Sequence, residues 1–315
     1  MALNKEIWIR DIVEGFVPDD SFLARSVDHS EYVDNKTVHV PQAGTEPNTT
    51  KNRSVFPATI KTRTDGELTY DLDIYDVEPL RVRNLADVEL SYDKRQSMLS
   101  QSKKKLQRDV AMDTLKKWIP SSPTVILTEG TGEDAHIHST ATGQRKAMTK
   151  KTVMAVRKQF DVDDVPDTGR VMLLDAIMYN QLLNSLTDAE VLNFLAGADP
   201  IKGVIGTFLG FTFMKRSSVL ITTPTGALKT GQASATDCAG ALAWQVDCVS
   251  RALGNVDLYE TIKDPTYYGD IFSYAVRAGG KYIREDKKGV VLISQGTPAE
   301  EAPIPNHPGA WSVKA

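Results

Sequence analysis

The clearest pattern of hydrophobic and polar positions lies between residues 67 and 75, where the two kinds of residue alternate. A period of two puts every apolar member on one side of an extended chain and predicts a half-buried strand. These apolar members are Leu68, Tyr70, Leu72 and Ile74. A second extended run occupies residues 55–64, and Asp65 and Gly66 separate the two runs. Because Asp-Gly favours a tight two-residue turn, we predict a β-hairpin across residues 55–75.

A hairpin of two strands is marginally stable by itself in water, because two strands cannot cover each other's apolar side. The neighbouring sequence offers no further strand signal of similar clarity. We therefore predict that the apolar side of this hairpin lies on a surface supplied from elsewhere.

A long helix is predicted over residues 93–118, a stretch that contains no Gly or Pro and ends just before Pro120. Its apolar residues form one narrow stripe made of Leu99, Leu106, Val110 and Trp118. About 25 helical residues span about 37 Å, so this helix is a strut that packs along one seam. Its polar side carries Lys103, Lys104, Lys105 and Arg108. A solvated face and a polyanion-binding face are both compatible with this cluster.

The middle of the chain alternates between predicted strands and helices, which indicates a compact α/β region. The predicted strands are residues 170–174, a strand pair within residues 204–213, and residues 219–221. The predicted helices are residues 149–160, 175–186, 187–195 and 234–253. Thr187 and Glu190 have the spacing of a capping box, in which each side chain satisfies the other residue's backbone N–H. The last of these helices is predicted from its many alanines.

The two ends of the chain differ in pattern from the middle. Residues 5–16 place Trp8 on an apolar helical face, which packs on its own domain or docks on a neighbouring subunit. Residues 17–54 contain many breakers and little periodicity, so we predict an extended arm. Three C-terminal strands, at residues 271–277, 281–284 and 290–294, predict an antiparallel meander with a turn at Gly279 and Gly280.

Composition narrows the class of protein. Of 315 residues, 25% are charged and 41% are hydrophobic, which is ordinary for a soluble domain. The net charge of -4 argues against a protein whose whole surface is built to coat nucleic acid. We find no signal peptide and no apolar run of about 18 residues, so we expect a soluble protein that matures in a cytoplasm. Cys238 and Cys248 fall in one predicted helix about 15 Å apart, too far for a disulfide, and we expect buried free thiols.

Motifs for catalysis and for metal binding are not recognisable in the sequence. Residues 129–134 form a glycine-containing loop that is rich in acids and lacks the Lys-Ser/Thr ending of a phosphate-binding loop. His136 and His138 have no third ligand at a recognisable spacing. We therefore predict no catalytic residue, no cofactor and no metal, which favours a structural role over an enzyme.

Several local sequences, taken in their order, identify a family. Pro79-Leu80-Arg81-Val82 with Glu89-Leu90-Ser91-Tyr92-Asp93-Lys94-Arg95 is similar to the join between the extended loop and the spine helix in phage coat proteins. Asp264-Pro265-Thr266-Tyr267-Tyr268-Gly269-Asp270 and Val276-Arg277-Ala278-Gly279-Gly280-Lys281 are similar to that family's return from its axial to its peripheral domain. Over nearly its whole length the chain resembles tailed-bacteriophage major capsid proteins of the Hong Kong 97 fold.

The resemblance implies an α+β fold with named parts. These are an N-terminal arm (1–54), an extended loop (55–90), a peripheral domain (91–167) that includes the spine helix (about 93–118), an axial domain (168–262), a return β-meander (263–295) and a C-terminal tail (296–315). The resemblance also implies that the surface missing from the hairpin is another copy of the chain.

The implied function is assembly, through hexamers and pentamers, of an icosahedral shell around a double-stranded DNA genome. The implied partners are further copies of the chain, a separate scaffold protein, a portal and non-specifically contacted DNA, with no membrane. The implied location is the virion, after assembly in the cytoplasm of a bacterial host. Some relatives cross-link a loop lysine to a neighbour's asparagine, and Lys61 is the nearest lysine, but no partner for it is evident and we expect no cross-link.

Two groups of residues are the candidates for these contacts. The inter-subunit candidates are Trp8, Lys61, Asp65, Gly66, Leu68, Tyr70, Leu72 and Ile74. The inward basic candidates are Lys103, Lys104, Lys105 and Arg108.

Three other hypotheses remain open at this stage. A bacterial nanocompartment shell has the same fold and encloses cargo enzymes. A nucleic-acid-binding protein would use Lys103–Lys105 and Lys150–Lys151 and bind in a salt-dependent manner. An enzyme would need a deep pocket with convergent titratable groups in the α/β region.

Overall fold

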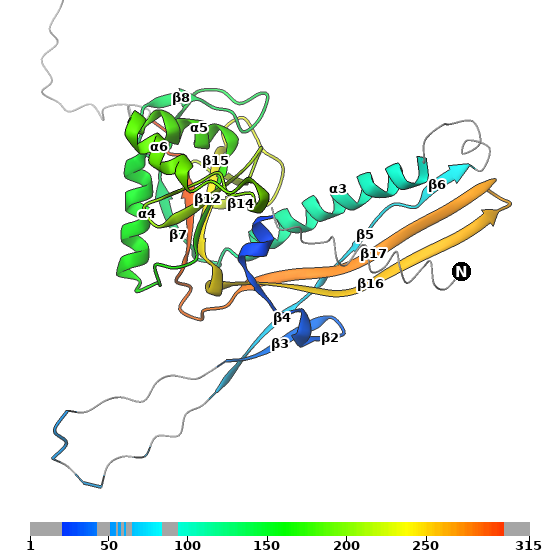
Figure 1. The fold of residues 1–315 in the computed structure, drawn as a ribbon, viewed down its shortest axis with the longest axis horizontal. Coiled ribbons are helices and arrows are strands. Elements are labelled where there is room, and N and C mark those ends of the chain that lie inside the picture. The colour runs from blue at the N-terminus through cyan, green and yellow to red at the C-terminus, as the bar shows by residue number, and fades with distance from the viewer. Residues whose placement is uncertain are drawn as a thin grey trace, which may run out of the picture. The chain divides into compact units, whose positions relative to one another are not determined.

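The computed structural model divides the chain into two compact units. The first comprises Met1–Pro120 and Val246–Lys287, and the second comprises Ser121–Gln245 and Lys288–Ala315 (Figure 1). The residues that the structure describes are 21–42, 51–54, 56–57, 60, 65–83 and 94–298. The predicted N-terminal helix, Trp8 and Lys61 lie outside these residues.

The first unit is built on a long antiparallel hairpin of β16 and β17. Edge strands extend the sheet, because β1 pairs with β16 while β5 and β6 pair with successive parts of β17. These strands are β1 (Val27–Asp28), β5 (Asp73–Asp76), β6 (Leu80–Arg83), β16 (Val249–Asp264) and β17 (Gly269–Tyr282). Two short 3-10 helices, η1 (Phe22–Arg25) and η2 (Ser30–Tyr32), precede and follow β1.

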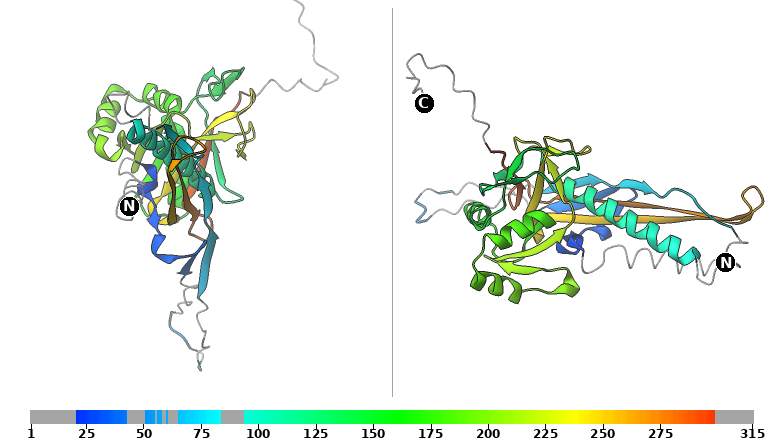
Figure 2. Two further views of the ribbon diagram at one scale, coloured as in Figure 1. Left: turned by 90° about the vertical axis from the view of Figure 1, so that its right-hand side faces the viewer. Right: turned by 90° about the horizontal axis from the view of Figure 1, so that it is seen from above.

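Helix α3 (Lys94–Lys117) lies along one face of this sheet (Figures 1 and 2). Leu106 and Val110 pack with Leu258 of β16 and Tyr274 of β17 in one buried cluster. The buried Trp118 follows the helix and donates a hydrogen bond from Nε1 to the Ser250 carbonyl oxygen at 2.7 Å. The predicted helix is therefore confirmed, and so is its stripe at Leu106, Val110 and Trp118.

The predicted turn at Gly279 and Gly280 is wrong, because both residues lie inside β17. A Cβ at Gly280 would lie 2.3 Å from the Ser250 carbonyl oxygen and 2.8 Å from Thr114 Cγ2. Glycine is thus required here by the close approach of α3 and β16, and no change of chain direction is involved.

The prediction of a hairpin across residues 55–75 gave its second strand the wrong partner. β4 (Gly66–Asp71) pairs antiparallel with β3 (Thr37–Gln42), from Gly66 opposite Gln42 to Asp71 opposite Thr37, and β3 pairs with the short β2 (Val33–Asp34). Gly66 therefore begins β4, with Asp65 just before it, and the two residues do not form the turn. The actual connection runs over residues 43–65, which a search for short-range turns cannot detect.

The second unit is a mixed sheet with helices packed against it. Its central strand β15 pairs with β10, β13 and β18, while β10 pairs in parallel with β12. The strands of this sheet are β7 (Thr124–Leu127), β10 (Arg170–Asp175), β11 (Gly206–Phe208), β12 (Phe211–Arg216), β13 (Leu220–Thr222), β14 (Leu228–Lys229), β15 (Cys238–Gln245) and β18 (Val290–Ser294). β8 (Gly132–Asp134) and β9 (Gln144–Lys146) form a separate hairpin.

The helices of this unit match their sequence signals. They are α4 (Lys150–Val162), α5 (Ala176–Asn184) and α6 (Asp188–Ala196), with the 3-10 helix η3 (Pro200–Lys202) after α6. Asp175 caps α5, since its Oδ1 accepts from the Ile177 N–H at 2.7 Å. The predicted capping box of Thr187 and Glu190 is present at the start of α6.

The predicted helix over residues 234–253 is wrong. This segment forms β15, the 3-10 helix η4 (Val246–Cys248) and the start of β16. Every residue of β15 is buried, and a strand covered on both faces favours small side chains such as the alanines present here. Burial thus overrides the helical propensity of alanine. Cys238 and Cys248 are buried free thiols as expected, although they do not share a helix.

The predicted C-terminal meander is also wrong. β17 is one strand paired with β16, whereas β18 belongs to the second unit and pairs with β15 and β7. The boundaries between the two units fall after residues 120, 245 and 287. Within the described residues, no helix combines the length and the apolar character needed to cross a membrane.

Candidate functional site

The titratable side chains that the sequence singled out are engaged in separate local contacts. His136 Nε2 lies 3.0 Å from Asp175 Oδ2, and His138 Nδ1 lies 2.7 Å from the Thr140 hydroxyl. Among the described residues, no cluster of three or more His, Cys, Asp or Glu is arranged to hold a metal ion. The candidate functional sites of the described residues are therefore exposed surfaces.

The paired strands β3 and β4 with the connection between them, which we name the β3–β4 arm, are anchored to the rest of the same chain. Leu68, Tyr70 and Leu72 are buried and pack with Val38 and Ala252. This overturns the expectation that their apolar side remains uncovered until another subunit binds it. The period-two pattern was correct for these three residues, but β16 and β3 of the same chain supply the covering surface.

Polar contacts reinforce this anchor. The Ser250 hydroxyl donates to the Tyr70 hydroxyl at 3.2 Å, and burial raises the pKa of Tyr70 to about 12. In β5, the Tyr75 hydroxyl donates to Asp113 Oδ2 on α3 at 2.6 Å, and burial is the main reason why the pKa of Tyr75 is raised. Lys117 of α3 forms an ion pair with Asp73.

Ile74 differs from the other three apolar residues of its run, because 55% of its side chain is exposed. β4 ends at Asp71 and β5 begins at Asp73, and Tyr75 replaces Ile74 on the side that faces α3. The interruption between the two strands reverses the alternation. Ile74 therefore stays available as a contact residue.

The connection between β3 and β4 carries exposed apolar residues that the sequence analysis missed. Phe56 is 76% exposed and Ile60 is 92% exposed, while Asp65 and Gly66 are exposed at the start of β4. The arm itself runs away from the β16–β17 hairpin (Figure 1). Phe56 and Ile60 had only a weak signal in the sequence, because single apolar residues between polar ones match no periodic pattern.

The basic candidates lie on α3. Lys104, Lys105 and Arg108 are exposed, on the side of the helix opposite the buried Leu106 and Val110. Lys103 is half-buried. Arg108 Nε lies 3.7 Å from Asp109 Oδ1 in a long, exposed ion pair. The outer face of α3 is therefore a cationic strip.

The tip of the β16–β17 hairpin is a further surface that the sequence analysis did not identify as a contact site. Tyr267 is 51% exposed and Tyr268 is 80% exposed. Tyr268 also has a φ of 51°, in a region that side-chain-bearing residues rarely occupy. Exposed tyrosines are typical of protein contact surfaces, because each offers a large apolar ring and a polar hydroxyl.

The comparison with solved structures shows the fold of this chain. The chain is similar to the capsid of the cyanophage P-SCSP1u (TM-score 0.59, 15% identity, 87% of each chain), the capsid of Ralstonia phage GP4 (TM-score 0.58, 16% identity, 91% of each chain) and the head of Helicobacter pylori bacteriophage KHP40 (TM-score 0.56, 11% identity, 89% of this chain and 91% of that one). No protein-family model matches, and no curated protein is detectably similar in sequence. The chain has the Hong Kong 97 fold expected from its sequence.

Proposed function

We propose that this chain is the major capsid protein of a tailed bacteriophage, which assembles through hexamers and pentamers into an icosahedral shell around double-stranded DNA. The observation that carries the proposal is the likeness to phage capsid structures over about nine tenths of the chain. A fold that recurs in shell subunits supports a role in assembly.

The contacts between subunits come from the parts of the chain that project. Repeated heterologous contacts, in which two different surfaces of the same chain meet, close into rings of five or six. The β3–β4 connection supplies one surface, through the exposed Phe56 and Ile60 together with Asp65, Gly66 and Ile74. Trp8 and Lys61 remain proposed contacts on the basis of the sequence. The buried Leu68, Tyr70 and Leu72 serve to hold this arm in place.

The cationic strip of α3 is proposed to contact the packaged DNA without sequence preference. Lysine and arginine neutralise phosphates whatever the base sequence. Lys104, Lys105 and Arg108 are accessible for this purpose, and Lys103 is partly accessible. The remaining proposed partners are a separate scaffold protein and a portal, with assembly in the host cytoplasm and the mature protein in the virion. The axial role is assigned to the second unit, and the peripheral role to the sheet and helix of the first.

The test is assembly of the purified chain, alone and with a co-expressed scaffold protein from the same genome. We expect rings or closed shells by sedimentation and negative-stain electron microscopy. Shells whose DNA survives nuclease treatment would support the DNA-containing virion in particular. A folded chain that stays monomeric at high concentration in both preparations would contradict the proposal.

A further inference from the structure

A two-residue turn in the second unit has an unusual first residue. Leu209 and Gly210 join β11 to β12, with φ values of 51° and 85°. Hairpin turns with positive φ at both positions favour Asn, Asp or Gly at the first, because a branched side chain is strained there. Leu209 therefore opposes the backbone preference of its own turn. The side chain of Leu209 is partly buried and packs against the core of its own unit, which offsets the cost of the turn and holds the side chain in one place.

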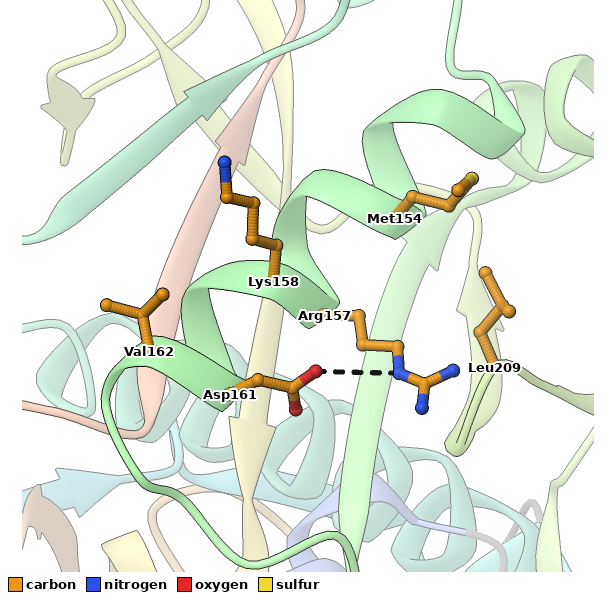
Figure 3. A pocket seen from close by; sticks show the side chains of 6 residues that line it. All are labelled: Met154, Arg157, Lys158, Asp161, Val162 and Leu209. Atoms are coloured by element: carbon orange, nitrogen blue, oxygen red, sulfur yellow. Dashed lines mark ion pairs between the residues drawn. The ribbon is translucent and has the colours of Figure 1, made fainter.

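Leu209 forms one wall of a shallow groove, which we name the α4 groove (Figure 3). Its lining residues are Met154, Arg157, Lys158, Asp161, Val162 and Leu209, around a volume of about 460 Å³. Met154 is 53% exposed and Val162 is 70% exposed, so the groove presents apolar surface to solvent.

The rim of the α4 groove is cationic. Its lining holds two cations, Arg157 and Lys158, against one acid, Asp161, which lies 3.7 Å from Arg157. Lys158 is exposed at the same rim. An apolar surface with this rim is complementary to an apolar surface that carries an acid.

The same unit displays such a surface on α6, which we name the α6 ridge. Leu192 is 72% exposed and Leu195 is 46% exposed, and Ile201 of the following η3 is 80% exposed. Asp188 is exposed one turn before Leu192, on the same side of the helix. Large exposed apolar side chains gathered on one helix face mark a contact surface.

The α6 ridge is fixed so that it faces outward from its own chain. Phe194, on the opposite side of α6, is completely buried in the core. Glu190 at the start of the helix accepts from Lys150 at 2.8 Å and from the Thr187 N–H at 2.9 Å. These anchors hold α6 in place, so its exposed leucines are available to another molecule.

We propose that the α6 ridge of one copy docks in the α4 groove of the next copy, and that this contact closes the ring. The inference rests on the proposed function, because a heterologous ring needs two complementary surfaces on one chain. The ridge supplies leucines and Asp188, and the groove supplies Met154, Val162 and the cationic rim. Leu209 is a positioning residue of this interface, since its strained turn sets one wall of the groove.

The closing experiment is a cross-link within assembled particles. The double variant Met154→Cys, Leu195→Cys is assembled and oxidised, and the products are separated on a non-reducing gel. The native Cys238 and Cys248 are buried, which keeps the background low. We expect a ladder of covalent oligomers that ends at the ring size, and no ladder from either single variant. Particles without a ladder would overturn this inference and leave the proposed function intact, whereas failure of the unmodified chain to assemble would count against the proposed function itself.

A charge exchange tests the same contact if the cysteine variant does not assemble. Lys158→Glu is expected to lower particle yield at least about tenfold, because two acids would then face each other across the contact. A tenfold change in an association constant needs only a modest loss of contact free energy. Adding Asp188→Lys to that variant is expected to restore most of the yield. Lys151→Glu, which makes the same change on α4 outside the groove, is the matched control and should assemble normally. Wild-type yield from Lys158→Glu, or no recovery with Asp188→Lys, would overturn the inference.

Discussion

At the scale of single residues, a few buried side chains connect segments that are distant in the sequence. Trp118 donates to Ser250 on β16 and meets Phe22 of η1 edge to face, with ring centroids 6.0 Å apart. Its ring is completely buried. One indole thus ties the end of α3 to η1 and to the β16–β17 hairpin.

Glu190 provides a prediction for pH dependence at this scale. Its pKa is lowered from 4.5 to about 2, chiefly because the Lys150 ammonium donates to the carboxylate, with further hydrogen bonds from Thr187. A lowered pKa in the folded state stabilises the fold above pH 4.5, and this contribution is lost as the pH falls from 4.5 towards 2.

We therefore expect Glu190→Gln to lower the thermal melting temperature at pH 6. The difference from the wild type should shrink as the pH falls through this window, because the wild-type carboxylate then loses its charge. Melting curves at a series of pH values measure it. A difference that stays constant down to pH 2 would show that the capping geometry matters and the charge does not.

At the scale of elements, the seam between α3 and β17 depends on the absence of a side chain. Gly280 lets β16 and α3 approach so closely that a Cβ would lie 2.3 Å from the Ser250 carbonyl oxygen of β16 and 2.8 Å from Thr114 Cγ2 of α3. The Ser250 carbonyl oxygen also accepts from Trp118 Nε1, so an added methyl group must disturb both the strand and the helix.

We expect Gly280→Ala to lower the free energy of unfolding by about 1–3 kcal/mol, the usual cost of overpacking. Gly231→Ala is the control, since a Cβ there would meet no atom within 4 Å. Chemical denaturation of both variants measures the difference. Equal stability of the two would mean that the seam relaxes without cost.

The β3–β4 arm makes a second prediction for an element. Gln42 and Gly66 are the last paired residues of the two strands, so residues 43–65 can be replaced by Asn-Gly in a tight turn. The shortened chain should keep its stability, because the buried anchor at Leu68, Tyr70 and Leu72 is untouched. It should fail to form shells by electron microscopy. Normal shells from this variant would mean that the connection has no role in assembly.

At the scale of the whole molecule, charge is distributed unevenly. The chain has a net charge of -4, yet the outer face of α3 presents Lys104, Lys105 and Arg108 together. A local cationic strip on an acidic protein binds polyanions without making the whole surface adhesive. This arrangement fits the proposed contact of the chain with packaged DNA.

The triple variant Lys104→Gln, Lys105→Gln, Arg108→Gln should weaken DNA binding by the assembled subunits at low salt. Each phosphate contact adds about 0.9 to the slope of log affinity against log salt concentration, so the slope should fall by up to about 3. Fluorescence anisotropy over a salt series measures it, with Lys151→Gln as a single-charge control. An unchanged slope would remove α3 from the DNA-binding surface.

The sequence by itself determined the features that a few neighbouring residues specify. The stripe of α3, the capping box of α6 and the alternation of Leu68, Tyr70 and Leu72 were all predicted correctly, because helical and strand periodicities are local properties. The fold was also predicted correctly, from several short resemblances in a fixed order, as the likeness to the capsid structures shows. It identified candidate contact residues without revealing which of them are exposed.

The tertiary structure decided which segments pair and which faces are covered. β4 pairs with β3 across a connection of residues 43–65, and β18 joins a different unit from β17. The alanine-rich β15 is a strand because both its faces are buried, and Gly280 is required by a helix that precedes it by more than 160 residues of chain. The pairing of strands and the burial of their faces depend on contacts between residues far apart in the chain. The pattern of residues within a short segment therefore does not reveal them.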